Sequence, residues 1–269
     1  MNHKKSTRKG PKLADGRTAE VFAWGEDQVL KLYREGWSRR VVEFEHHQAL
    51  ASQQTGYRVP QVGEIVEIDE RVGIIYQRLE GETMFNAIQN NLFSFPGFTR
   101  QMTDMHLEMH VCEASGLETI RQRLTDKICA VDFLPPGAQE KILKHLHALP
   151  EKSKLLHGDF HPDNIMLTPD GPLIIDWIDA TLGHPLADVA RTTVIGTFGV
   201  PPEEKFGRLL FRQMVRGYLR RYFRFSPFER KELDAWLLPV AAGRLSEDIL
   251  HEREPILAYV SKLMGKLED

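Results

Sequence analysis

The hydrophobic and polar positions change their period along the chain. Residues 12–33 form three short runs in which β-branched and aromatic residues alternate with polar ones, separated by Gly and Asp turns. Residues 38–56 then have apolar positions at helical spacing between a serine start signal and a glycine stop. Two more alternating runs surround residues 69–71. This pattern predicts a five-stranded antiparallel sheet with one helix after the third strand.

The rest of the chain follows a longer period. Leu, Ile and Met recur three and four positions apart from residue 82 to 150, and helical patterns return over residues 203–225 and 228–265. We expect Pro239 and Pro255 to interrupt the last of these helices. The predicted fold class is α+β, with a tail over residues 1–11, a small sheet lobe over 12–80 and a larger helical lobe over 81–269. A cleft between two lobes is a favoured ligand site.

One polar stretch, residues 157–164, is predicted to be an irregular loop. Pro162 lacks an amide hydrogen and keeps the preceding residue out of helical angles. The turn sequence Pro-Asp-Gly at 169–171 then folds residues 165–175 into a hairpin. A hairpin returns the chain to within roughly 5 Å of its start, so we expect Asn164 and Asp176 to be neighbours, with Asp159 facing the same space.

These three side chains favour phosphoryl transfer. The amide oxygen of Asn164 and the carboxylate of Asp176 suit a hard cation such as Mg²⁺. A third carboxylate, Asp159, would orient an attacking hydroxyl group and take its proton. We therefore predict Asp159 as the catalytic base and Asn164 and Asp176 as metal ligands.

The stretch HGDFHPDN at 157–164, followed by IIDW at 174–177, resembles the aminoglycoside phosphotransferase and choline kinase branch of the protein-kinase-like fold. The resemblance covers nearly the whole chain. It implies a two-lobe kinase that transfers the γ-phosphate of ATP, with Mg²⁺, to a hydroxyl group of a small molecule such as an aminoglycoside-like sugar or an amino alcohol. GTP stays open as an alternative donor.

The same resemblance implies a nucleotide site. Lys31 in VLKLY would contact the α- and β-phosphates, and Glu45 would be its ion-pair partner, with Glu43 as the alternative. The linker that includes Gln77 and Leu79 would meet adenine through its backbone. Asp188 in HPLADVA would support the catalytic loop.

The first turn of the chain departs from the protein-kinase pattern. It contains only Gly16 where protein kinases have three glycines, so we expect Arg17, Thr18 or backbone amides to contact the phosphates.

Acidic residues near the end of the chain suggest the acceptor. Carboxylates recur in the last helices and just beyond the hairpin, and they would attract a cationic acceptor by charge complementarity. The residues are Asp179, Glu247, Asp248 and Glu252.

Two other functions compete with the kinase interpretation. His157, Asp159 and His161 alternate, and in a strand they would share one face and could bind the metal ion of a hydrolase. A nucleotide-binding scaffold without catalysis, in the manner of pseudokinases, is the third class.

Composition narrows the partners. The formal net charge of −3 lacks the basic excess of a nucleic-acid-binding protein. No apolar run reaches 18 residues, and the two cysteines lack metal-ligand spacing, so we expect a cytoplasmic protein with no membrane partner. The pattern assigns no oligomeric state.

One basic stripe has two possible roles. Arginine recurs every fourth residue from Arg208 to Arg224, at 208, 212, 216, 220 and 224. It would either pair with nearby carboxylates on a solvated face or meet an anionic partner.

Overall fold

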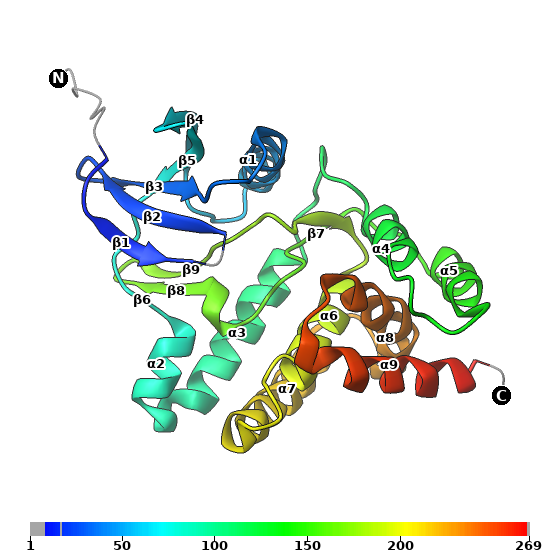
Figure 1. Ribbon diagram of the computed structural model, residues 1–269. Helices are drawn as coiled ribbons and strands as arrows, with labels where there is room; N and C mark the ends of the chain where they lie inside the picture. Colours follow the sequence, from blue (N-terminus) through cyan, green and yellow to red (C-terminus); the bar gives the residue numbers. More distant parts are fainter. Residues whose placement is uncertain (1–8, 17, 268–269) are drawn as a thin grey trace.

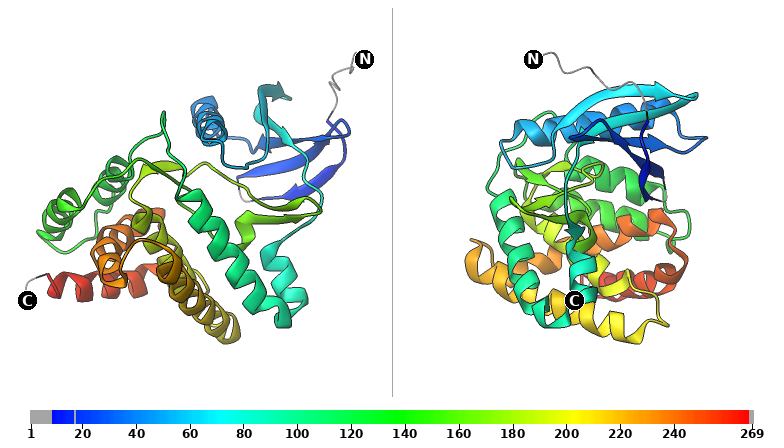
Figure 2. Two further views of the ribbon diagram at one scale, coloured as in Figure 1. Left: turned by 180° about the vertical axis from the view of Figure 1, so that it is seen from behind. Right: turned by 90° about the vertical axis from the view of Figure 1, so that its left-hand side faces the viewer.

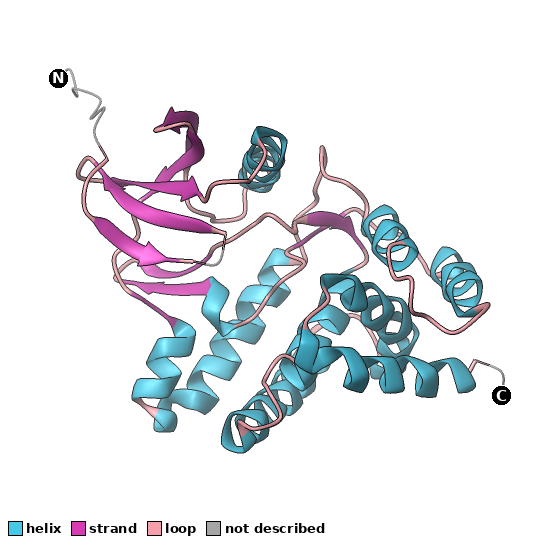
Figure 3. Cartoon of the chain, in the orientation of Figure 1, coloured by secondary structure: helices cyan, strands magenta, loops and turns pink. Residues whose placement is uncertain are grey.

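The computed structural model describes residues 9–16 and 18–267. A five-stranded sheet with one helix beside it occupies the upper part of Figure 1, and the other helices lie below it with two small sheets (Figures 1 and 3). The predicted α+β layout, a sheet lobe followed by a helical lobe, is confirmed. Arg17 and residues 1–8 of the predicted tail lie outside the described residues.

The five-stranded sheet has the strand order β1-β2-β3-β5-β4, and all neighbours are antiparallel. Helix α1 (Arg39–Gln54) connects β3 to β4 and packs on β4 and β5. It begins after Ser38, and Gly56 follows it with a positive φ of 80°, as the sequence predicted. The strands are β1 (Lys12–Asp15), β2 (Ala19–Trp24), β3 (Gln28–Tyr33), β4 (Val62–Ile68) and β5 (Arg71–Gln77).

Two small sheets connect this lobe to the helices. Strand β6 (Glu82–Thr83) pairs with β8 (Ile165–Thr168), which forms the predicted hairpin with β9 (Gly171–Ile174). Strand β7 (Lys154–Leu156) pairs with β10 (Thr181–Gly183). The catalytic-loop candidate runs between β7 and β8 and includes the short helix η2 (Pro162–Asn164).

The helical lobe packs around α6 (Pro185–Phe198), which is buried along most of its length and contacts α7, α8 and α9. A helix that is surrounded by others holds its polar side chains in fixed positions, and α6 carries Asp188 and Arg191. Figure 2 shows these helices gathered on the side away from the five-stranded sheet. The other helices are α2 (Met84–Asn90), η1 (Leu92–Ser94), α3 (Phe95–Met109), α4 (Ile120–Cys129), α5 (Ala138–Ala148), α7 (Lys205–Phe225), α8 (Arg230–Arg244), η3 (Leu245–Glu247) and α9 (Leu250–Gly265).

The expected breaks at two prolines were wrong. Pro239 lies inside α8 and Pro255 inside α9, and the chain leaves its helical path between them, at η3 and Asp248 with φ of 51°. Proline at 239 removes the amide that would bond the carbonyl of Ala235. The ring of His145 bonds this carbonyl at 2.7 Å instead, so α8 continues.

Candidate active site

The loop after β7 is held in a sharply bent path. Gly158 has a φ of 80°, and a side chain there would lie 2.3 Å from the carbonyl oxygen of Asp179, so only glycine fits. The ring of His157 lies across the loop, with Nδ1 accepting from the amide of Asp159 (3.2 Å) and Nε2 contacting the carbonyl of Ile175 (3.0 Å). The histidine therefore ties the loop to the hairpin exit.

Asp188 supports this loop from below. Its carboxylate accepts the backbone amides of His157 at 2.7 Å and Gly158 at 2.9 Å. The Nε2 atoms of His106 and His110 lie 3.1 and 3.4 Å from the same carboxylate. Burial alone would raise the pKa of Asp188, but the two histidine contacts hold it well below its ordinary value. Asp188 is thus a buried anion of α6 that holds the start of the loop through two backbone amides.

The two histidines are held in turn by tyrosines of α7. Tyr218 and Tyr222 each place a hydroxyl group 2.7 Å from Nδ1, of His106 and His110 respectively. Burial lowers the pKa of His106 to about 3, so its ring is neutral, and the nearby carboxylate of Asp188 favours a proton on Nε2. Neither histidine was predicted from the sequence as a site residue.

Asp159 is surrounded by three polar side chains. The amide nitrogen of Asn164 donates to its backbone oxygen (2.9 Å) and contacts its carboxylate (3.3 Å). His161 and Arg191 lie 3.3 and 3.5 Å from the carboxylate. Burial would raise the pKa of Asp159, but His161 and Arg191 lower it far below its ordinary value. Asp159 is therefore ionised at neutral pH.

The hairpin brings together the two predicted metal ligands at the backbone level. The amide of Ile175 donates to the carbonyl of Asn164 at 2.9 Å, and Asp176 follows directly. Asp176 has a φ of 63°, an uncommon conformation that strained functional residues often adopt. Its carboxylate contacts Nζ of Lys31 at 3.1 Å.

Lys31 and Glu45 form the ion pair that the resemblance implied, at 2.8 Å. Glu45 is only 2% exposed, and it also accepts hydrogen bonds from the hydroxyl groups of Tyr33 and Tyr76. Burial would lower the pKa of Lys31, but the carboxylates beside it raise the pKa overall. The alternative partner, Glu43, is exposed and pairs with an arginine one turn earlier in α1.

The other predicted nucleotide contacts lie at or next to strand ends, in the first turn and at the end of β5 or just after it. Thr18 is half-buried in the first turn, where Arg34 bonds the carbonyl of Gly16 at 2.9 Å. Gln77 is exposed at the end of β5, and Leu79 is half-buried in the link to β6. Arg17 lies outside the described residues.

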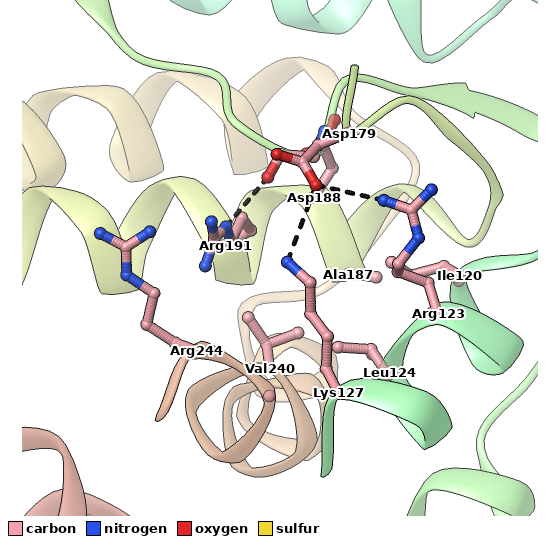
Figure 4. A pocket seen from close by; sticks show the side chains of 12 residues that line it. Ile120, Arg123, Leu124, Lys127, Asp179, Ala187, Asp188, Arg191, Val240 and Arg244 are labelled. Carbon is pink, nitrogen blue, oxygen red and sulfur yellow. Dashed lines mark hydrogen bonds and ion pairs between the residues drawn. The ribbon is translucent and has the colours of Figure 1, made fainter. Parts of the chain in front are cut away.

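One predicted acceptor residue, Asp179, lines a pocket beside the loop of Asp159 (Figure 4), and a second, Glu247, pairs with basic residues that line it. Asp179 lies 3.1 Å from Arg123 and 3.7 Å from Lys127. Glu247 lies 3.1 Å from Lys127 and 2.7 Å from Arg191. The pocket has a volume of about 30 Å³, which is room for one or two water molecules. The carboxylates of Asp179 and Glu247 thus each have at least two basic partners.

The other two predicted acceptor residues are engaged elsewhere. Glu252 is buried and binds the guanidinium group of Arg244 through both oxygens, at 2.7 Å each. Asp248 is exposed and pairs with Arg253. The four acidic residues are thus not brought together as one free acidic cluster.

The residues of the rival hydrolase do not converge. Both ring nitrogens of His157 are used in backbone contacts, and of the two histidines only His161 contacts the carboxylate of Asp159. Within residues 9–16 and 18–267, the one group of three such side chains at metal-ligand spacing is His106, His110 and Asp188. Hydrogen bonds already occupy its ligand atoms.

A carboxylate on a loop, a hairpin and a lysine–glutamate pair are the groups that a kinase-like phosphotransferase requires. A model of the phosphotransferase enzyme family matches residues 9–236, and the chain belongs to this family. Acyl-CoA dehydrogenase family member 11 from Pongo abelii is 32% identical over 93 residues. That match covers 30% of this chain and 12% of the relative's length.

Solved structures show the same protein-kinase-like fold. An aminoglycoside phosphotransferase mutant with AMP-PNP and hygromycin B has a TM-score of 0.63, with 16% identity and coverage of 95% of this chain and 91% of that chain. A choline/ethanolamine kinase family protein from Mesorhizobium loti has a TM-score of 0.60 at 16% identity, covering 96% and 89%. Amicoumacin kinase hAmiN with AMP-PNP and Ca²⁺ has a TM-score of 0.58 at 15% identity, covering 97% and 88%.

Helices long and apolar enough to cross a membrane do not occur in the part of the chain that the structure describes.

Proposed function

We propose that this protein transfers the γ-phosphate of ATP to a hydroxyl group of a small molecule, with Mg²⁺ as the metal ion. The observation that carries the proposal is the bridge between the lobes. Lys31 of β3 contacts Asp176 at 3.1 Å across 145 residues of sequence, while Glu45 holds the lysine from α1. A cation for phosphates and an anion for a metal are therefore adjacent, one residue beyond the hairpin that carries Asn164.

The residues fit a magnesium ion chemically. Asp176 supplies a carboxylate, 42% exposed, and Asn164 supplies an amide oxygen. The amide nitrogen of Asn164 already donates to Asp159, which leaves the oxygen as the atom for a cation. Both are the hard oxygen ligands that Mg²⁺ prefers. When bound, the ion would neutralise charge on the phosphates.

Asp159 would orient the acceptor. Its carboxylate is ionised at neutral pH and accepts a hydrogen bond from the acceptor hydroxyl group. The hydroxyl oxygen then forms a bond to the γ-phosphorus, the bond from that phosphorus to the β–γ bridging oxygen breaks, and the hydroxyl proton passes to Asp159. Because a carboxylate of low pKa is a weak base, Asp159 contributes mainly by holding the oxygen in line.

Lys31 would bind the α- and β-phosphates, with Arg17, Thr18 or backbone amides of the first turn beside them. Gln77 and Leu79 would meet the adenine ring through their backbone. Two of the similar solved structures contain AMP-PNP, which supports ATP as the donor.

The acceptor would approach Asp159 from the side of the pocket in Figure 4, with the side chain of Lys127 displaced to make room. An amine-bearing acceptor would exchange places with Lys127, the cation that Asp179 and Glu247 share. The hygromycin B complex of one similar structure and the choline/ethanolamine kinase family name of another support such acceptors.

The test is release of ADP from Mg²⁺-ATP over a panel of aminoglycosides, amino alcohols, sugars and nucleosides. Asp159→Asn should lower turnover by about 10² to 10⁴, because it removes the carboxylate that orients the hydroxyl group and takes its proton. The dissociation constant of ATP should stay nearly unchanged, because the phosphate contacts remain. Asp163→Asn makes the same chemical change at an exposed position of η2 and is the control. Near-normal turnover by Asp159→Asn would contradict the assignment.

The panel also separates the competing functions. A noncatalytic scaffold would bind ATP without releasing ADP. A metallohydrolase would retain a tightly bound transition metal and act without ATP.

A further inference from the structure

Helix α7 presents a continuous basic side to solvent. Its exposed cations are Lys205 and the arginines at 212, 216, 220 and 224, with Phe206 and Leu209 between them. At 3.6 residues per turn these positions span roughly a third of the helix circumference. We call them the basic face. It lies on the lobe away from the five-stranded sheet, at the bottom of Figure 1.

The arginines of the basic face have no ion-pair partner within residues 9–16 and 18–267. Arg221, by contrast, is not part of the basic face and binds Asp104 through two contacts of 2.6 and 2.8 Å. Arg208 of the predicted stripe is half-buried and is not part of the basic face either. No carboxylate occurs between residues 205 and 225, so the face is positive along its whole length. The pairing expected for a solvated stripe is therefore not found there.

Large apolar side chains accompany these charges. Phe206 is 64% exposed and Leu209 is 57% exposed, both near the start of α7. Exposed apolar side chains beside unpaired arginines are unusual on a surface that faces only water.

We propose that the basic face docks this protein onto an anionic phospholipid surface. Arginines along one side of a helix would contact lipid phosphates, while Phe206 and Leu209 enter the boundary between headgroups and acyl chains. Docking of the basic face on a lipid surface does not require a helix that crosses the membrane. It revises the expectation of no membrane partner, and it is independent of the phosphotransfer chemistry.

Other partners fit this face less well. A second copy of the chain that paired through it would bring like charges together, because a two-fold interface uses the same patch twice. Nucleic acid would use the arginines but leave the apolar side chains without a role. The protein as a whole is also acidic, with a formal net charge of −3.

Vesicle flotation with the full chain tests the proposal. Vesicles of phosphatidylcholine with roughly one third phosphatidylserine should bind the protein, and pure phosphatidylcholine should not. The variant R212Q/R220Q should bind about 25-fold more weakly, since each arginine near an anionic surface is worth about fivefold. Raising the salt to about 1 M should release the protein, because the Debye length falls to about 3 Å.

A matched variant tests whether the position of the lost charges matters, or only their number. Arg40 of α1 and Lys144 of α5 are exposed on other elements, and R40Q/K144Q lowers the net charge equally. This control should bind as the unmodified protein does, and F206S/L209S should weaken binding without changing the salt dependence. Circular dichroism checks that each variant is folded.

Three results would overturn the proposal. They are no binding to phosphatidylserine vesicles by the unmodified chain, equal loss in R212Q/R220Q and R40Q/K144Q, and retention on a nucleic acid or acidic-peptide column without vesicle binding.

Discussion

Replacing Asp188 with asparagine tests whether the catalytic loop depends on one buried carboxylate. Asp188 is 1% exposed and accepts from four donors, the amides of His157 and Gly158 and the rings of His106 and His110. Asparagine has nearly the same shape but only one acceptor oxygen. If that oxygen serves the three donors at Oδ2, the new NH₂ group faces the amide of Gly158, and two donors oppose each other.

The magnitude follows from these contacts. An orphaned buried donor costs about 1–3 kcal/mol, and loss of charge from the remaining bonds adds about 1 kcal/mol. We expect the free energy of unfolding to fall by about 2–4 kcal/mol, which lowers Tm by roughly 5–15 °C for a chain of this size. A loop displaced by about 1 Å would lower turnover about 100-fold.

Thermal unfolding by circular dichroism and phosphotransfer turnover measure both effects. Asp163→Asn is the control here too, because Asp163 is exposed in the same loop. If Asp188→Asn matched Asp163→Asn in Tm and in kcat, Asp188 would not hold the loop.

Two further predictions concern buried ionisable groups. Glu45→Gln leaves Lys31 without its buried partner, so we expect the free energy of unfolding to fall by about 3 kcal/mol and the KM for ATP to rise. Glu43→Gln, at an exposed position of the same helix, is the control. Equal stability and equal KM in the two variants would contradict the role of Glu45. Burial lowers the pKa of His106 to about 3 and that of His184 to about 4. The unfolded chain therefore takes up protons first, below about pH 6.5, and the free energy of unfolding should fall as the pH drops from there towards about 4. His184→Asn keeps an acceptor for the helix amide and should flatten this decline in urea denaturation; an unchanged slope would refute it.

The hairpin was predictable because its signals are local. Pro162 and the Pro-Asp-Gly turn at 169–171 act on their immediate neighbours, and their effect depends little on the rest of the chain. The structure accordingly joins Asn164 to Ile175 through a 2.9 Å hydrogen bond. The pairing of Lys31 with Glu45 was expected from the motif resemblance, and α1 does bring the two side chains together.

Partners that are distant in sequence had no such signal. His106 and Asp188 are 82 residues apart, and a lone histidine at an apolar helix position does not indicate which carboxylate it meets. The continuation of α8 through Pro239 could not be predicted either, because the carbonyl that the proline leaves free is bonded by His145 of another helix. Nor could the pairing of Asp179 and Glu247, because their basic partners come from other helices.

The sequence by itself determined the alternation of strands and helices, the irregular loop at 157–164, the hairpin and the residue types needed for phosphoryl transfer. These depend on backbone preferences and on side-chain periodicity, which act over a few residues. Only the tertiary structure decided which charges are paired. It paired Asp179 and Glu247 with basic side chains and left the arginines of the basic face without an ion pair among the described residues, because ion pairing depends on which helix faces another after packing.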